Sequence, residues 1–135
     1  YPRQALAAVT THDLPTIAGL WSGTDLQEQY SVGLQPNDAG TRALRTRLGT
    51  LTGVADDADV REVVLRTHRL LAEAPSTLIT ASLEDALAIA ERPNMPGTST
   101  ERQNWSLALP VPLEALRAHP LPRKLAGVLA RRQAA

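Results

Sequence analysis

Two short apolar runs and one long helical repeat dominate the pattern of hydrophobic and polar positions in this chain. Residues 5–9 and 77–81 are short apolar segments that each lead into a polar turn, and this pattern predicts two buried strands. Residues 58–74 place apolar side chains at helical spacing and stop before Pro75, which predicts a long helix. Strands joined by a helical crossover are parallel in nearly all known cases, so we expect a βαβ unit whose two polar ends point the same way.

Weaker signals occupy the rest of the chain. Further helices are predicted at four places: residues 16–21, 38–51, 112–119 and 122–133. After the first of these, Thr24 or Asp25 is expected to cap a segment that is mostly loop. Two prolines and a glycine in residues 92–100 predict an ordered loop there.

The helix predicted over residues 38–51 contains two glycines. It is expected to begin after Asn37, a favourable cap, and to be interrupted at Gly40 and Gly49. Its apolar residues share one face: Ala43, Leu44, Leu48 and Leu51. The last predicted helix ends in Arg131 and Arg132, which suit the negative end of a helix dipole.

Composition excludes several classes of function. The 135 residues carry 14 Lys and Arg against 14 Asp and Glu, so no positive surface for nucleic acid or an anionic membrane is expected. No segment approaches the roughly 18 apolar residues that span a bilayer. Because cysteine is absent, disulfides and thiolate chemistry are excluded. We expect a cytoplasmic protein, and the oligomeric state stays open.

The chain is also expected to be a fragment. It starts at Tyr1, its one methionine is Met95, and only 3% of its residues are aromatic, with no phenylalanine. Aromatic side chains supply much of the buried area of a small domain, so this content is low for a core that is complete in itself.

Candidate chemistry lies at the end of the first predicted strand. His12 and Asp13 follow residues 5–9, and in parallel α/β folds ligands bind outside the carboxyl ends of the strands. The other histidines, His68 and His119, lie too far along the chain for a metal-ligand spacing. We therefore do not expect a zinc enzyme.

Four segments in a fixed order carry a family resemblance. They are Thr11-His12-Asp13-Leu14-Pro15-Thr16, Leu83-Glu84-Asp85, Asn94-Met95-Pro96-Gly97-Thr98 and Asn104-Trp105. In this spacing they resemble the C-terminal end of the 4-α-glucanotransferases, or amylomaltases, of glycoside hydrolase family 77. The Thr-His-Asp segment alone would also fit the wider α-amylase clan, whereas the Asn-x-Pro-Gly-Thr and Asn-Trp segments make the resemblance specific. It covers residues 8–109.

The resemblance implies an α/β fold, namely a helix-rich part of a (β/α)8 barrel. The seventh strand would end at His12 and Asp13, and residues 77–81 would be the eighth strand. Residues 1–135 would then form the C-terminal fragment, about the last quarter, of a single catalytic barrel domain. A barrel of this kind needs about 200 to 400 residues, so this chain could not close one.

The resemblance further implies transfer of α-1,4-glucan segments between malto-oligosaccharides, with retention through a glucosyl-enzyme intermediate. Retention needs a nucleophile and an acid/base about 5 Å apart, and neither family motif for them occurs here, so the chain alone is expected to be inactive. Asp13 would be the third carboxylate, bound to the 2- and 3-hydroxyls of the transferred sugar. His12 and, more weakly, Asn94 would contact sugar hydroxyls. No cofactor is implied.

Other roles stay open for several residues. Asp85 is expected to cap or orient a helix over residues 86–90 rather than touch substrate. Trp21 and Trp105 are expected in the core, and Gly97 is expected to supply a positive φ. The remaining polar residues singled out are assigned to surface positions: His68 and Arg69 on a solvated helix face, and His119 at a helix end.

Two other functions stay open as well. The chain could belong to a hydrolase of the α-amylase clan, which differs in whether water or a sugar accepts the glucan. It could also be a small helical interaction module without catalysis, an idea favoured by the amphipathic segment 58–74 and the incomplete catalytic set.

Overall fold

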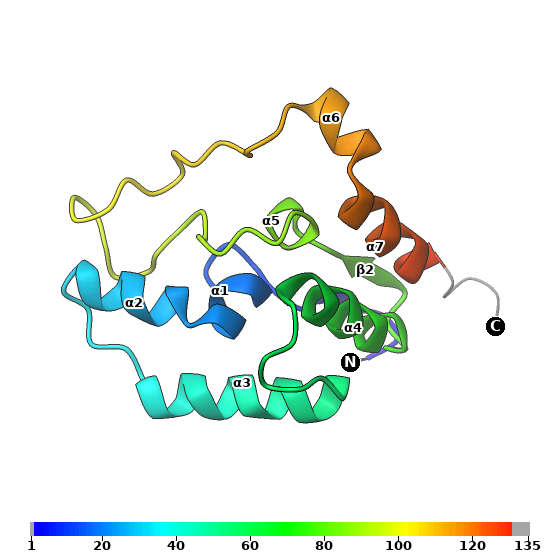
Figure 1. The fold of residues 1–135 in the computed structure, drawn as a ribbon, viewed down its shortest axis with the longest axis horizontal. Coiled ribbons are helices and arrows are strands. Elements are labelled where there is room, and N and C mark those ends of the chain that lie inside the picture. Colours follow the sequence, from blue (N-terminus) through cyan, green and yellow to red (C-terminus); the bar gives the residue numbers. More distant parts are fainter. Residues whose placement is uncertain (1, 131–135) are drawn as a thin grey trace.

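The computed structural model describes residues 2–130, which contain one short parallel sheet (Figure 1). Strand β1 (Leu6–Ala8) pairs with β2 (Leu78–Thr80), with Leu6 opposite Leu78 and Ala8 opposite Thr80. The Thr77 amide extends the pairing by donating to the Arg3 carbonyl at 2.7 Å. The predicted parallel pair is therefore confirmed, and the turns that follow the two strands lie at the same edge of the sheet.

Residues 2–130 also contain seven helices. In chain order they are α1 (Ile17–Ser22), α2 (Thr24–Ser31), α3 (Asp38–Thr52), α4 (Val60–Ala72), α5 (Leu83–Ala86), α6 (Leu113–Ala118) and α7 (Pro120–Ala130). Helix α3 lies along one side of the molecule, and the coil between α5 and α6 crosses the opposite side, passing the end of α2 (Figure 1). The part of the predicted 122–133 helix beyond residue 130 lies outside the described residues.

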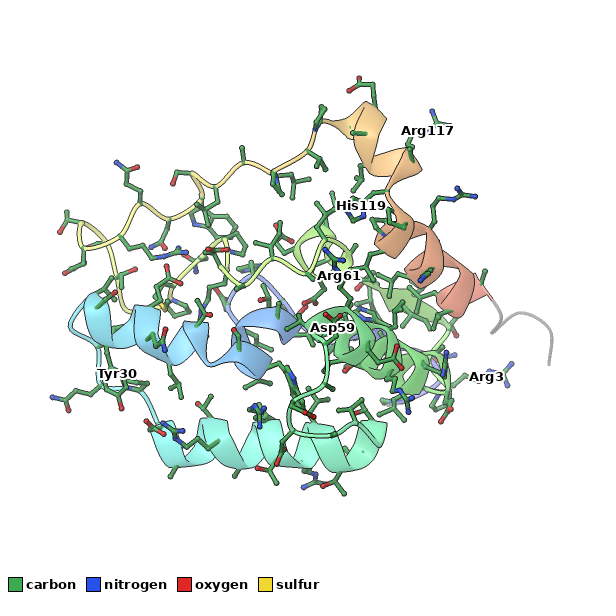
Figure 2. The ribbon with its side chains drawn as sticks, in the orientation of Figure 1. Arg3, Tyr30, Asp59, Arg61, Arg117 and His119 are labelled. Carbon is green, nitrogen blue, oxygen red and sulfur yellow. The ribbon has the colours of Figure 1, made fainter. Side chains whose placement is uncertain are left out.

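Helix α4 forms the centre of the core. It contacts α1, α3 and α7, and its Val63 and Val64 are fully buried. The other buried members of this cluster are Ile17, Trp21, Ala86 and Leu125. The helix begins at Asp59, whose side chain accepts from the Arg61 amide at 2.9 Å, and it ends three residues before Pro75. The helix predicted from the periodicity of residues 58–74 is therefore confirmed. Figure 2 shows charged side chains such as Arg3 and Arg117 pointing away from this core.

Helix α3 differs from its prediction in one respect. Asn37 caps it, accepting from the Gly40 amide at 3.0 Å, but neither glycine interrupts the helix. Of its apolar face, Leu48 packs against the core, whereas Leu44 and Leu51 are 53% and 58% exposed. Its buried side carries Gly49 and Thr52.

Trp21 explains why α3 packs through this side. The indole lies in the core, as predicted, and its Nε1 donates to the Ala58 carbonyl at 3.1 Å. A Cβ at Gly49 would stand 3.3 Å from the indole ring, so glycine permits the close approach of the helix. The Arg45 guanidinium covers the ring at 4.1 Å and donates to the Trp21 carbonyl at 2.8 Å.

Two burial predictions are wrong. His68 was expected on a solvated face but is fully buried, with Nδ1 2.8 Å from the Val64 carbonyl one turn earlier, whereas Arg69 beside it is exposed. The strands are also less buried than predicted, since Leu6 and Leu78 are 56% and 61% exposed. Within the described residues the sheet has two strands, so nothing there covers the face formed by these paired leucines.

Candidate functional site

The loop that carries His12 and Asp13 joins β1 to α1 and is fixed at both ends by one buried carboxylate. Asp85, which is fully buried, accepts from the Thr10 hydroxyl before the loop. It also accepts from the Ile17 amide after the loop, at 2.8 Å. A carboxylate at the N-terminus of a helix satisfies an amide that has no partner within the helix. Asp85 therefore holds the two ends of the loop together.

This role of Asp85 differs from the predicted one. Residues 86–90 do not form a helix, because α5 spans Leu83–Ala86. The cap of α5 is Ser82, whose hydroxyl accepts from the Asp85 amide at 3.0 Å. Asp85 is thus free to bond the neighbouring segment. As predicted, a structural role fits it better than a contact with ligand, since its side chain is closed off from solvent.

The three predicted site residues come together beside this loop. The Asn94 amide Nδ2 donates to Asp13 Oδ1 at 2.7 Å, and His12 Nε2 lies 3.3 Å from Asp13 Oδ2. The side chains of His12 and Asp13 are 56% and 52% exposed. Consecutive residues of a strand point to opposite faces, but these two follow β1 in a turn closed by a 3.1 Å bond from the Leu14 amide to the Thr11 carbonyl. Both can therefore face the same ligand.

Asn94 belongs to a loop that folds back on itself. The Asn104 side chain accepts from the Met95 amide and donates to the Thr98 hydroxyl, each at 2.9 Å. Gly97 has the predicted positive φ, 87°. The two family-like segments around Asn94 and Asn104 thus interlock. Farther along, Ser99 donates its amide to Glu101 at 2.8 Å, and this hydrogen bond lowers the pKa of the Glu101 carboxyl.

Trp105 was predicted in the core, and this prediction is wrong. The side chain is 65% exposed, and its backbone adopts a φ of 63°, which costs a non-glycine residue about 1 kcal/mol or more. A 2.8 Å bond from the Trp105 amide to the Pro93 carbonyl stabilises this conformation. The indole then lies beside His12, with 5.1 Å between ring centroids. The sequence feature that could have indicated this position for Trp105 is that it directly follows Asn104, within the segment that carries the family resemblance.

His12 and Trp105 share a cavity of about 340 Å³. Its other lining residues are Thr10, Thr11, Thr16, Ser82, Glu84, Pro93 and Leu107. The lining combines hydroxyls, one carboxylate and an aromatic face. Such a surface suits a ligand with many hydroxyls and apolar C–H faces.

Sequence reasoning missed the ion pair that supports Asp13. The guanidinium of Arg92 donates through Nη1 to the Asp13 carbonyl at 3.0 Å, and its Nη2 lies 2.6 Å from Asp25 Oδ1. Asp25 was expected to cap a segment that is mostly loop, and this prediction is wrong. The segment is the helix α2, its cap is Gly23, and Asp25 lies in its first turn. No periodicity marks such a pair, because its members lie far apart in the sequence.

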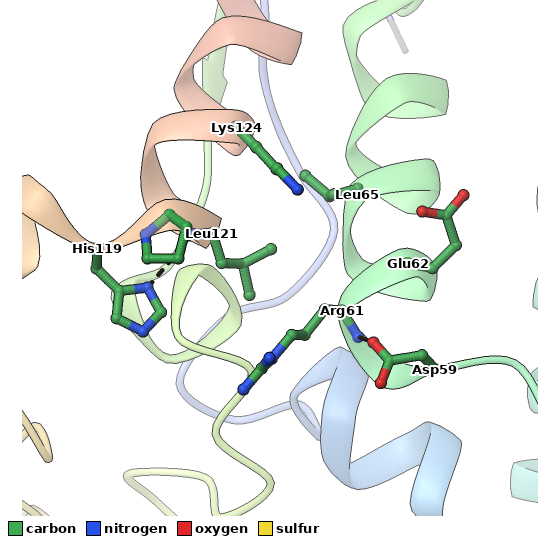
Figure 3. A pocket seen from close by; sticks show the side chains of 8 residues that line it. Asp59, Arg61, Glu62, Leu65, His119, Leu121 and Lys124 are labelled. Carbon is green, nitrogen blue, oxygen red and sulfur yellow. Dashed lines mark hydrogen bonds between the residues drawn. The ribbon is translucent and has the colours of Figure 1, made fainter.

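A second cavity, of about 290 Å³, lies between the starts of α4 and α7 (Figure 3). It is lined by Asp59, Arg61, Glu62, Leu65, His119, Pro120, Leu121 and Lys124. The acidic groups already act within α4, where Asp59 is the cap and Glu62 pairs with Arg66. His119 ends α6, as predicted. None of the predicted site residues lines this cavity.

Residues 2–130 contain no group of three or more His, Asp or Glu side chains arranged to hold a metal ion. Among the same residues, no helix is both long and apolar enough to cross a membrane.

Comparison with known proteins gives one consistent result. Residues 1–113 match the model of glycoside hydrolase family 77, described as 4-alpha-glucanotransferase. A 4-alpha-glucanotransferase of Mycobacterium tuberculosis is 36% identical over 119 residues, covering 79% of this chain and 16% of the relative. One from Haemophilus influenzae is 30% identical over 131 residues, covering 84% of this chain and 19% of the relative.

A solved structure extends the similarity to the fold. The crystal structure of amylomaltase from Corynebacterium glutamicum superposes with a TM-score of 0.83 at 26% identity. The alignment covers 96% of this chain and 22% of the amylomaltase. The chain therefore spans less than a quarter of each of these relatives.

Proposed function

This chain belongs to glycoside hydrolase family 77, the 4-alpha-glucanotransferases, and we propose on that basis that it is the C-terminal part of a catalytic (β/α)8 barrel. Strands β1 and β2 are then the seventh and eighth of the barrel, and residues 1–135 belong to one domain. The uncovered face formed by Leu6 and Leu78 supports this proposal. In a barrel, such residues are covered by side chains from the other strands.

The proposed reaction is transfer of an α-1,4-glucan segment from one malto-oligosaccharide to another, with retention at the anomeric carbon. The glucan is held covalently between the two steps, and the nucleophile and the acid/base come from the part of the enzyme outside this chain. Asp13 accepts hydrogen bonds from the 2- and 3-hydroxyls of the transferred sugar. Bonds to the 2-hydroxyl strengthen as the ring approaches the oxocarbenium ion, so Asp13 acts mainly on the transition state.

One observation carries the assignment of the site. The Asn94 amide on the Asp13 carboxylate, with His12 beside it, joins the loop after β1 to the loop that follows β2 and α5. His12 and Asn94 then donate to hydroxyls of the same sugar or of its neighbour. The cavity shared by His12 and Trp105 supplies an aromatic surface on which an adjacent glucose ring packs.

The test uses the full-length polypeptide that contains this chain, with maltotriose as the only substrate. Asp13→Asn keeps the shape of the side chain but removes its charge, and we expect turnover to fall by about 100-fold or more, the range that loss of one transition-state contact produces. Asp57→Asn is the matched control, because Asp57 is an exposed aspartate in the loop before α4, and its turnover should equal that of the wild type. Circular dichroism should be the same for all three proteins. Unchanged turnover in Asp13→Asn would exclude the proposed role.

The products distinguish a transferase from a hydrolase of the same clan. Transfer yields glucose together with chains longer than maltotriose, whereas hydrolysis yields only glucose and maltose. The 135-residue chain by itself should give neither set of products. A chimera in which this chain replaces the matching segment of the Mycobacterium tuberculosis relative should transfer glucan, and the same chimera with Asp13→Asn should not.

A further inference from the structure

A buried ion pair connects α2 to the site. Arg92 Nη2 lies 2.6 Å from Asp25 Oδ1, and the two side chains are only 6% and 2% exposed. Gln29, one turn along α2, donates to the other carboxylate oxygen of Asp25 at 2.8 Å. Charged side chains are rarely buried to this degree unless they are paired. The pair therefore fixes the Arg92 guanidinium in one place.

Arg92 and Asn94 hold Asp13 at two points. Arg92 Nη1 donates to the Asp13 main-chain carbonyl at 3.0 Å. Two residues along the loop, Asn94 Nδ2 donates to the Asp13 carboxylate at 2.7 Å. The bond from Asn94 alone would let the Asp13 carboxylate move with its backbone. The bond from Arg92 alone would let the carboxylate rotate about the side-chain bonds. The two bonds together define the position of the carboxylate.

We propose that Arg92, oriented by Asp25 from α2, is a positioning residue that places the Asp13 carboxylate for the glucan transfer reaction. This inference rests on the proposed function of Asp13. A hydrogen bond that forms mainly in the transition state tolerates a displacement of only about 0.5 Å. A misplacement of about 1 Å in an active site costs on the order of 100-fold in rate.

Another ion pair between this loop and α2 provides a matched control. Arg102 Nε lies 2.6 Å from Glu28 Oε1 on the same helix, with the side chains 9% and 23% exposed. Arg102 also donates to the Arg92 carbonyl and, at 2.9 Å, to the Asn104 side chain. This pair connects the same loop to α2, but the side chains of Glu28 and Arg102 make no hydrogen bond to Asp13.

The first experiment compares Arg92→Lys with Glu28→Gln in the full-length enzyme acting on maltotriose. Lysine retains the charge but not the planar fork that reaches both Asp25 and the Asp13 carbonyl. We expect kcat of Arg92→Lys to fall about 10- to 100-fold, with KM within about threefold of the wild type. Glu28→Gln should keep kcat within about threefold, although it weakens the attachment of the loop.

A second variant separates positioning from stability. Replacing one member of a buried pair strands the other charge, so Asp25→Asn alone would be strongly destabilised. In the double variant Asp25→Leu/Arg92→Met, apolar side chains of similar size replace both charges, an exchange that is often neutral for stability. We expect its Tm to return close to that of the wild type, while kcat stays as low as in Arg92→Lys.

Two results would overturn the inference. One is recovery of kcat together with Tm in the double variant, and the other is an equal loss of kcat in Glu28→Gln. A wild-type protein without transfer activity would instead refute the proposed function. In that case a crystal structure of Arg92→Lys still tests the positioning. If the Asp13 carboxylate keeps both its position in the fold and its 2.7 Å contact with Asn94, Arg92 is not a positioning residue.

Discussion

Replacing Asp85 should loosen the loop that carries His12 and Asp13 more than any other part of the structure. The fully buried Asp85 carboxylate accepts from the Thr10 hydroxyl and from the Ile17 amide. Each hydrogen bond to a charged group contributes about 1.5 to 3 kcal/mol. Asp85→Ala loses both bonds and strands a buried amide, so we expect the free energy of opening this loop to fall by about 3 to 5 kcal/mol.

The conservative substitution should cost much less. In Asp85→Asn the amide oxygen can still accept from the Ile17 N–H, and the new NH2 group can donate to the Thr10 oxygen. Two charge-assisted bonds are exchanged for two neutral ones of about half the strength. We expect a loss of about 1 to 2 kcal/mol in the same opening free energy.

Hydrogen exchange measured by mass spectrometry on the full-length protein tests both values. Since about 1.4 kcal/mol corresponds to a factor of ten, amide exchange in residues 10–20 should accelerate at least about 100-fold in Asp85→Ala and about tenfold in Asp85→Asn. Exchange in α3 should not change, because α3 makes no direct hydrogen bond to Asp85. Asp57→Asn should behave as the wild type throughout. Wild-type protection of residues 10–20 in Asp85→Ala would refute the assignment of Asp85 as the anchor of this loop.

Two further predictions concern Trp105 and Gly49. Trp105→Ala should raise KM for maltotriose by up to about tenfold, with Tm unchanged, because the exposed indole beside His12 provides about 1 kcal/mol of stacking. An unchanged KM would show that the indole does not contact substrate. Gly49→Ala should lower the free energy of unfolding by about 1 kcal/mol, since its Cβ would lie 3.3 Å from Trp21. The control is Gly127→Ala within α7, where nothing lies within 4 Å of the added Cβ and where we expect a gain of about 0.5 to 1 kcal/mol; equal effects at both glycines would contradict the packing argument.

Predictions that depend on a local repeat agreed with the structure. The apolar spacing of residues 58–74 gave α4 to within about two residues at each end, and the short apolar runs gave both parallel strands. The cap at Asn37 and the positive φ at Gly97 were also correct. In each case the cause lies within a few residues of the effect, so the sequence contains it.

Several predictions that depend on contacts between distant segments were wrong, although the pairing of β1 with β2 was correct. The uninterrupted course of α3 through Gly49 was not predicted, because the side chain that packs against this glycine, Trp21, comes from another helix. His68 is buried because α4 lies in the centre of the molecule, with neighbours on several sides. The ion pair of Arg92 with Asp25 cannot be predicted from the residues around either one. Physical reasoning from one sequence cannot rank such partners before the fold brings them together.

The aspartates Asp13, Asp25 and Asp85 have different roles in the proposed site because they differ in burial. Asp85 and Asp25 are at most 2% exposed, and the fold already occupies their oxygens. Asp13 is half-exposed, and each of its oxygens has one neighbouring polar group, Asn94 at 2.7 Å and His12 at 3.3 Å. A carboxylate offers about four lone-pair positions, so each Asp13 oxygen can still accept one hydroxyl. On the proposed function, two vicinal hydroxyls of the transferred sugar would donate to these two positions, whereas the side chain in Asp13→Asn would offer only one acceptor oxygen.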